Sequence, residues 1–144
     1  MSIHHTLERP PLADMRILIG KPGLDGHDIG AKIVALTLRN AGAEVIYTGL
    51  RRSPDQIASV AVDEGVDAVG LSILSGSHKE LVRDVLAALR ERGAGDIRVF
   101  LGGTIPADDH PALLAQGVAA IFTSDMRLDD VVATLAAKLA RASS

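Results

Sequence analysis

The feature that most constrains the fold is an alternation of short apolar runs with longer amphipathic segments. The short runs cover residues 15–19, 44–48, 68–72, 98–101 and 119–122. Each run is followed by a segment that carries apolar residues at helical spacing, a pattern typical of repeated β-α units in a parallel sheet. The chain is therefore predicted to alternate five strands with five helices.

Capping signals mark where these helices begin and end. The second helix is predicted to begin at Ser53-Pro54-Asp55-Gln56, which has a serine cap, a proline at the first helical position and a glutamine three residues after the cap. The third is predicted to begin near Ser77 and to end before Gly93. We assign to the core the apolar stripe of the last helix, Leu128, Val131, Val132, Leu135 and Leu139.

Five β-α units with right-handed crossovers predict a specific topology. The fold expected is α/β, a flavodoxin-like (Rossmann-like) doubly wound five-stranded parallel sheet of order 2-1-3-4-5 with helices on both faces. Ligands of such sheets bind beyond the carboxyl ends of the strands, near the point where the strand order reverses.

Length and composition narrow the class of protein. The 144 residues fit one domain, and 47% hydrophobic with 23% charged residues is typical of a globular protein. A net charge of -3 and 2% aromatic residues argue against nucleic-acid binding, and the lack of cysteine excludes disulfides and thiolate metal sites. No apolar run approaches the length of a membrane span and no signal peptide is recognised, so we expect a cytoplasmic location and no membrane partner.

The chain divides into an arm and a domain. Residues 1–14 lack apolar periodicity and are predicted to form a flexible N-terminal arm, whereas residues 15–144 form the predicted ligand-binding domain. His4 and His5 in the arm are compatible with metal binding, but we expect the arm to be disordered or to lie along a partner.

Residues 20–30 are longer and more polar than an ordinary strand-to-helix loop and are rich in glycine. They contain His27, whose neutral imidazole is a good nitrogen ligand for a metal. Asp25 and Lys21 supply the carboxylate and the cation that commonly orient such a ligand. The simpler alternative is a polar loop with a solvated histidine.

Three further segments should converge on the same edge of the sheet. Residues 72–77 after the third predicted strand carry three hydroxyls and a glycine, residues 102–104 after the fourth begin with two glycines, and residues 122–124 after the fifth begin with Phe122. Together they predict a slot with a glycine floor, hydroxyl donors and one aromatic wall, suited to a large flat or elongated ligand. Taken singly, each segment is equally compatible with an ordinary turn.

Three ordered motifs resemble those of a known family. Asp25-Gly26-His27-Asp28-Ile29-Gly30 matches Asp-x-His-x-x-Gly, Ser72-Ile73-Leu74 matches Ser-x-Leu, and Gly102-Gly103 follows. Over residues 15–141 the chain resembles the cobalamin-binding (vitamin B12) domain of B12-dependent mutases and methyltransferases. Within that family it is most similar to acyl-CoA mutases of the isobutyryl-CoA, 2-hydroxyisobutyryl-CoA and methylmalonyl-CoA type, some of which carry this domain as a separate small subunit.

The resemblance implies a role for each matched residue. His27 would be the lower axial ligand of cobalt, with Asp25 and Lys21 as its hydrogen-bonded relay. The cofactor-binding positions would be Asp25, Gly26, His27, Asp28, Ile29, Gly30, Val34, Ser72, Leu74, Ser75, Gly102, Gly103, Phe122 and Thr123. Ile29 is a departure, because several relatives have arginine there.

The resemblance also implies an activity and a partner. The cofactor would be adenosylcobalamin, and the reaction would be the radical rearrangement of the carbon skeleton of a branched acyl-CoA. A large TIM-barrel subunit would bind the acyl-CoA, and two large and two small subunits would form a heterotetramer. This chain would supply no catalytic residue of its own and would be inactive without the large subunit.

Three alternatives stay open from the sequence. A corrinoid carrier for methyl transfer shares the three motifs. A small mononuclear metal enzyme could join His27 to residues predicted at the same edge, which are His78, His110, Asp108 and Asp109, although His110 precedes a proline in a predicted loop. A signalling receiver would need an aspartate where this chain has Ser72, which argues against that class.

Overall fold

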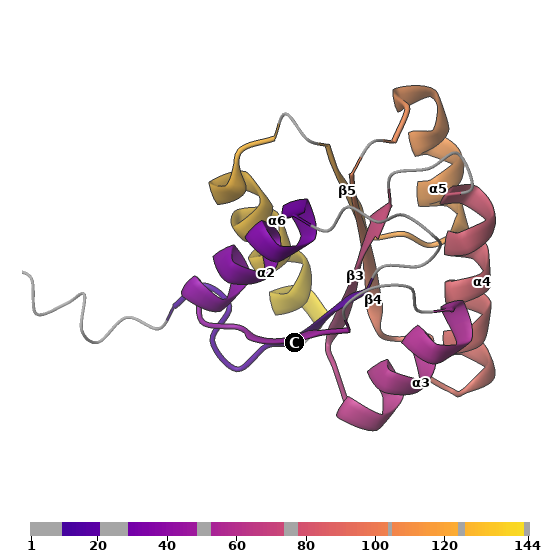
Figure 1. The fold of residues 1–144 in the computed structure, drawn as a ribbon, viewed down its shortest axis with the longest axis horizontal. Helices are drawn as coiled ribbons and strands as arrows, with labels where there is room; N and C mark the ends of the chain where they lie inside the picture. Colours follow the sequence, from indigo (N-terminus) through magenta and orange to yellow (C-terminus); the bar gives the residue numbers. More distant parts are fainter. Residues whose placement is uncertain are drawn as a thin grey trace, which may run out of the picture.

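The computed structural model describes residues 10–20, 29–48, 53–73, 78–103, 105–123 and 126–142. A five-stranded parallel sheet of order β2-β1-β3-β4-β5 forms the centre of the molecule (Figure 1). Its strands are β1 (Arg16–Gly20), β2 (Glu44–Tyr47), β3 (Ala68–Ile73), β4 (Arg98–Gly103) and β5 (Ala120–Thr123). The predicted flavodoxin-like topology is confirmed.

Helices cover both faces of this sheet (Figure 1). They are α2 (Ile29–Asn40), α3 (Pro54–Glu64), α4 (His78–Glu91), α5 (His110–Gln116) and α6 (Leu128–Ala142), and a short 3₁₀ helix, η1 (Ala107–Asp109), precedes α5. α2 and α6 lie on one face, and α3, α4 and α5 lie on the other. Among the described residues, no helix is both long and apolar enough to cross a membrane.

The strands alternate between two hydrophobic clusters because successive side chains point to opposite faces. In β1, Ile17 and Ile19 pack with α2 and α6, whereas Leu18 packs with α3, α4 and α5. The strands are therefore buried on both faces, as expected of a parallel sheet covered by helices on each side.

The start of α3 forms as its sequence predicts. The Gln56 N–H donates to Ser53 Oγ at 3.1 Å, and the Ser53 N–H donates to Gln56 Oε1 at 2.9 Å. This capping box satisfies two backbone donors at the helix start. Gly65 ends the helix in the left-handed region with φ of 61°.

Two boundary predictions need correction. Gly102 and Gly103 lie inside β4, not after it, because they pair with Ser72 and Ile73 of β3 on one side and with β5 on the other. Pairing on both sides thus overrides the low strand propensity of glycine. Leu128 was expected in the core but is 39% exposed, because it is the first residue of α6 and precedes the turn that packs on the sheet.

Residues 10–14 belong to the predicted arm, and the structure shows them packed against the domain. Leu12 is fully buried, and its N–H donates to the Ala41 carbonyl oxygen at 2.9 Å. Gly42 has a φ of 104°, and a Cβ there would lie 2.6 Å from Pro10 Cβ. This part of the chain therefore closes the turn between α2 and β2.

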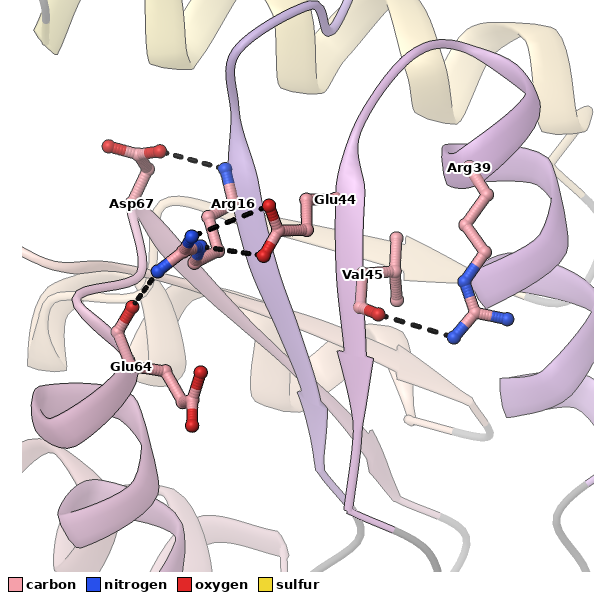
Figure 2. Close-up of polar contacts among 6 residues, drawn as sticks. All are labelled: Arg16, Arg39, Glu44, Val45, Glu64 and Asp67. Atoms are coloured by element: carbon pink, nitrogen blue, oxygen red, sulfur yellow. Dashed lines mark hydrogen bonds and ion pairs between the residues drawn. The ribbon is translucent and has the colours of Figure 1, made fainter.

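Polar contacts hold the starts of the first three strands together (Figure 2). The Arg16 guanidinium pairs with Glu44 of β2 at 3.0 Å and donates to the Glu64 carbonyl oxygen at 2.6 Å. The Arg16 N–H donates to Asp67 Oδ2 at 2.8 Å. This network lies at the amino-terminal edge of the sheet, so it fixes strand register at the end opposite the predicted site.

Candidate functional site

The predicted site lies where the parallel strands end. β1 ends at Gly20, β3 at Ile73, β4 at Gly103 and β5 at Thr123, and all four ends meet at one edge because the strands run in the same direction. α2 begins beside this edge at Ile29. The order change between β1 and β3 places the edge at the topological switch point, where ligands of this fold class bind.

Part of the predicted site falls outside the described residues. These positions are Lys21, Asp25, Gly26, His27, Asp28, Leu74 and Ser75. Ile29 and Gly30 form the first turn of α2, and only their backbone is described. The axial-ligand relay therefore stays a prediction, while the elements on either side of it are placed.

Three predicted site residues form one row across the sheet. Ser72 pairs with Gly102, and Gly102 pairs with Phe122. Phe100 lies two residues before Gly102 and belongs to the cluster that packs with α2 and α6, so the row faces the same layer. The structure thus brings the hydroxyl, the bare backbone and the aromatic ring of the predicted slot side by side.

The aromatic wall of this row is fixed by stacking. The rings of Phe100 and Phe122 are 6.0 Å apart between centroids and 15° from parallel. Phe100 is buried, whereas Phe122 is half-buried. Val34 of α2 is half-buried against the same cluster, and its role as a lining residue stays a prediction.

The described residues do not crowd Gly102. Among them, a Cβ at Gly102 would meet only the Phe122 carbonyl oxygen, at 3.8 Å. The half-buried Ser72 on one side supplies a hydroxyl within the same row. This arrangement suits an elongated polar group that lies against the sheet and accepts or donates one hydrogen bond at Ser72.

Gly103 and Thr123 pair with each other in the adjacent row, together with Ile73. At Gly103 a Cβ would overlap the Ile73 carbonyl oxygen, and φ is 123°. This glycine is therefore required by the close approach of β3 and β4 at the edge of the site. The structure places Gly103 and Thr123 beside the slot residues, in a different row.

Two contacts that the sequence did not predict lie near this edge; the first joins α4 to the segment after β4, and the second lies within that segment. Lys79 at the start of α4 forms an ion pair with Asp109 at 3.1 Å. His110 Nε2 lies 3.2 Å from the Ile105 carbonyl oxygen, which accepts the hydrogen bond. No local motif signals the Lys79–Asp109 pair, because the partners are far apart in sequence.

These contacts bear on the alternative of a mononuclear metal site. Asp109 and His110, two of its predicted ligands, bond to other protein groups. His110 begins α5 instead of lying in a loop, because Pro111 is well placed in the first turn of a helix. Within the part of the chain that is described, no group of three His, Asp or Glu side chains could hold a metal ion.

A cavity of about 670 Å³ lies at the other end of the sheet. Its lining includes Met15, Asp67, Arg98, Ala119 and Lys138. Met15, Asp67 and Ala119 directly precede strands, so the cavity opens at the amino-terminal edge and is distinct from the predicted slot. No described residue of the three motifs lines this cavity.

Comparison with known proteins gives the family. Residues 15–132 match the B12 binding domain. The chain is 41% identical over 131 residues to the 2-hydroxyisobutanoyl-CoA mutase small subunit of Aquincola tertiaricarbonis, covering 88% of this chain and 96% of that protein. It is 44% identical over 128 residues to the ethylmalonyl-CoA mutase of Methylorubrum extorquens, covering 88% of this chain but only 19% of that protein. The chain thus spans about a fifth of this larger relative.

Solved structures share the fold. A cobalamin-binding protein from Desulfitobacterium hafniense aligns with a TM-score of 0.74 and 21% identity, covering 87% of this chain and 58% of that one. Response regulators align with TM-scores of 0.61 to 0.67 at 14 to 20% identity, a likeness that shows the fold alone. With the match over residues 15–132, the chain belongs to the family of B12-binding domains.

Proposed function

We propose that this chain is the cobalamin-binding subunit of an adenosylcobalamin-dependent acyl-CoA mutase. The observation that carries the proposal is the similarity to a mutase small subunit over 96% of its length. The row of Ser72, Gly102 and Phe122 supports it, because a hydroxyl, an open backbone and an aromatic ring fit an elongated polar group of the cofactor.

The proposed axial ligand is His27. It follows β1 in the segment that leads to α2 at the edge of the sheet. Asp25 would accept the second imidazole N–H and Lys21 would hold that carboxylate, a partnership that fixes the tautomer of a metal-bound histidine. His27 would thus bind cobalt in place of the cofactor's own base, and Asp25 and Lys21 would hold the imidazole in position.

The proposed binding positions divide by role. Ser72 would bond to the nucleotide tail of the cofactor, while Gly102 and Phe122 would flank it. The remaining positions predicted to hold the tail or the corrin are Gly26, Asp28, Ile29, Gly30, Val34, Leu74, Ser75, Gly103 and Thr123. None of these groups would take part in bond breaking, so their contribution is binding and orientation.

The radical chemistry is assigned to the cofactor, and the binding of the acyl-CoA is assigned to a large partner subunit. When bound, adenosylcobalamin supplies the radical by homolysis of its cobalt–carbon bond. A large TIM-barrel subunit is proposed to bind the acyl-CoA, and the assembly is proposed to contain two large and two small subunits. A chain of 144 residues has no room for such a barrel.

The isolated chain is therefore expected to bind cobalamin without turning over an acyl-CoA. The measurement is conversion of isobutyryl-CoA or 2-hydroxyisobutyryl-CoA in the presence of adenosylcobalamin, with and without a large mutase subunit. Turnover of an acyl-CoA by the chain alone would contradict the proposal that a separate large subunit is required for the reaction.

The cofactor itself is tested by titrating adenosylcobalamin into the purified chain and recording the visible absorption spectrum. Reduction of the sample to cob(II)alamin then allows electron paramagnetic resonance. We expect a nitrogen splitting that changes when protein histidine carries ¹⁵N. Absence of binding both alone and with a large subunit would reject the function and favour the metal-site alternative.

A further inference from the structure

The two rings of the aromatic wall come from positions that lie diagonally across the pair of β4 and β5. Phe122 is opposite Gly102, and Phe100 is opposite Ala120. Phe100 and Gly102 are two residues apart in one strand, so they belong to the same face of the sheet. Aromatic side chains are long enough to span such a diagonal. Because the residue directly opposite each ring is small, the two rings meet each other instead.

The Phe122 ring is turned away from Gly102. A phenylalanine opposite a glycine can lay its ring over the bare backbone, an arrangement known from other sheets. Here no described atom of the ring lies within 4 Å of the place that a Cβ would take at Gly102, since only the Phe122 carbonyl oxygen does. The ring instead stacks on Phe100, 6.0 Å away between centroids. The stacking partner therefore decides which way the Phe122 ring points.

Phe100 has the properties of a fixed support for this ring. It is 2% exposed and belongs to the hydrophobic cluster that packs with α2 and α6. Phe122 is only half-buried and packs against the outside of that cluster. The chain contains two phenylalanines in all, and both are used in this one stack. A buried ring is held in one orientation by dense packing, so the stack passes that order on to the ring at the edge of the site.

We propose that Phe100 is a positioning residue for the nucleotide tail of the cofactor. Its ring holds the Phe122 ring away from Gly102 and keeps the backbone between Ser72 and Phe122 accessible to the tail. This inference rests on the proposed function and adds to it a residue that acts only through Phe122. Loss of the Phe100 ring lets Phe122 cover Gly102, which obstructs the tail. The proposed cobalt ligand, His27, lies in another segment, so cobalt ligation is not altered.

The test compares two ligands that differ only in the nucleotide tail. Adenosylcobalamin carries the tail, and adenosylcobinamide is the same corrin without it. The variant is Phe100→Leu, which keeps an apolar side chain but removes the ring. We expect it to bind adenosylcobalamin about tenfold more weakly than the unmodified chain, the scale of one aromatic pair, and adenosylcobinamide within about twofold. Visible absorption titrations of the full chain measure both affinities.

Two further variants separate this effect from damage to the core. Ile17→Val is the matched control, because Ile17 is 1% exposed in the same cluster but lies near the start of β1, at the other end of the sheet. It should lower the Tm and leave the ratio of the two affinities unchanged. Phe100→Met serves if the leucine variant does not fold, since methionine fills irregular space without supplying a ring. It should show the same selective loss.

A double variant tests whether Phe100 acts through Phe122. Each of Phe100→Leu and Phe122→Leu should reduce the preference for adenosylcobalamin over adenosylcobinamide. The double variant should then lose no more than about twofold beyond the larger single loss, because both changes remove the same stack. Losses that multiply would instead show two independent packing effects.

Other outcomes also overturn the inference. These are an unchanged affinity of Phe100→Leu for both ligands, equal weakening of both, and equal affinity of the unmodified chain for the two ligands. Failure of the unmodified chain to bind either ligand, alone and with a large subunit, would instead reject the proposed function. The two failures are therefore distinguishable.

Discussion

Replacement of Gly103 with alanine is expected to lower the free energy of unfolding by about 3 kcal/mol, the scale of a forced backbone strain. A Cβ at this position would overlap the Ile73 carbonyl oxygen and lie 2.9 Å from its carbonyl carbon. Both atoms belong to the backbone of β3, so the clash is relieved only if paired strands move apart. The φ of 123° adds strain for any residue that has a Cβ. Thermal unfolding followed by circular dichroism should show a Tm lower by about 10 °C.

The neighbouring glycine provides the control for this prediction. Among the described residues, the atom nearest to a Cβ at Gly102 would lie 3.8 Å away, so Gly102→Ala is expected to change the free energy of unfolding by less than about 1 kcal/mol. The same methyl group would occupy the row between Ser72 and Phe122, and we therefore expect weaker cobalamin binding. Equal stability of Gly103→Ala and Gly102→Ala would show that the approach of β3 to Gly103 is not needed for folding.

The fold was largely predictable because its signals are local and repeated. Each strand is a short apolar run, and each amphipathic helix has its own stripe and often its own cap, as Ser53 and Gln56 show for α3. Right-handed crossovers then leave few ways to order five parallel strands. The strand order 2-1-3-4-5 therefore follows from rules that hold for many chains with this pattern.

The errors arose where distant residues decide the local structure. The end of β4 was misplaced because glycine weakens a strand locally, while β3 and β5 supply hydrogen-bond partners to Gly102 and Gly103. Leu128 has the apolar character of its stripe, but its place at the helix start leaves it beyond the core. The strand pairing of Gly102 and Gly103 and the exposure of Leu128 both depend on tertiary contacts, which the periodicity of the sequence does not encode.

The candidate site was predictable to a different extent for each of its parts. Parallel topology alone predicts that the segments after β1, β3, β4 and β5 meet at one edge. The alignment of Ser72, Gly102 and Phe122 in one row depends on strand register, which the structure supplied. The ion pair between Lys79 and Asp109 had no sequence signal, since it depends on how α4 and η1 pack. The role of His27 rests on motif resemblance and stays a prediction.

Substitution of His27 by alanine is expected to remove the protein nitrogen from cobalt and to lower mutase activity by more than about a hundredfold, the upper range for loss of a partner of a ligand. Without the imidazole, the corrin would bind more weakly, with water or its own base below the metal. Electron paramagnetic resonance of cob(II)alamin should then show no splitting that responds to ¹⁵N-labelled protein histidine. Activity would be measured in the complex reconstituted with a large subunit.

Two further variants test whether the loss of activity in His27→Ala is caused by the loss of the cobalt ligand. Asp25→Asn keeps the imidazole and should lose only roughly ten- to a hundredfold in activity, because it disturbs the partner of the ligand and not the ligand itself. His110→Ala is the matched histidine control, since its ring bonds to the Ile105 carbonyl oxygen at the same edge. It should leave the labelled splitting in place, and loss of the splitting in this variant would contradict the assignment of His27 as the nitrogen ligand. Full activity in both His27→Ala and Asp25→Asn would refute the relay, because neither the ligand nor its orientation would then contribute to the reaction.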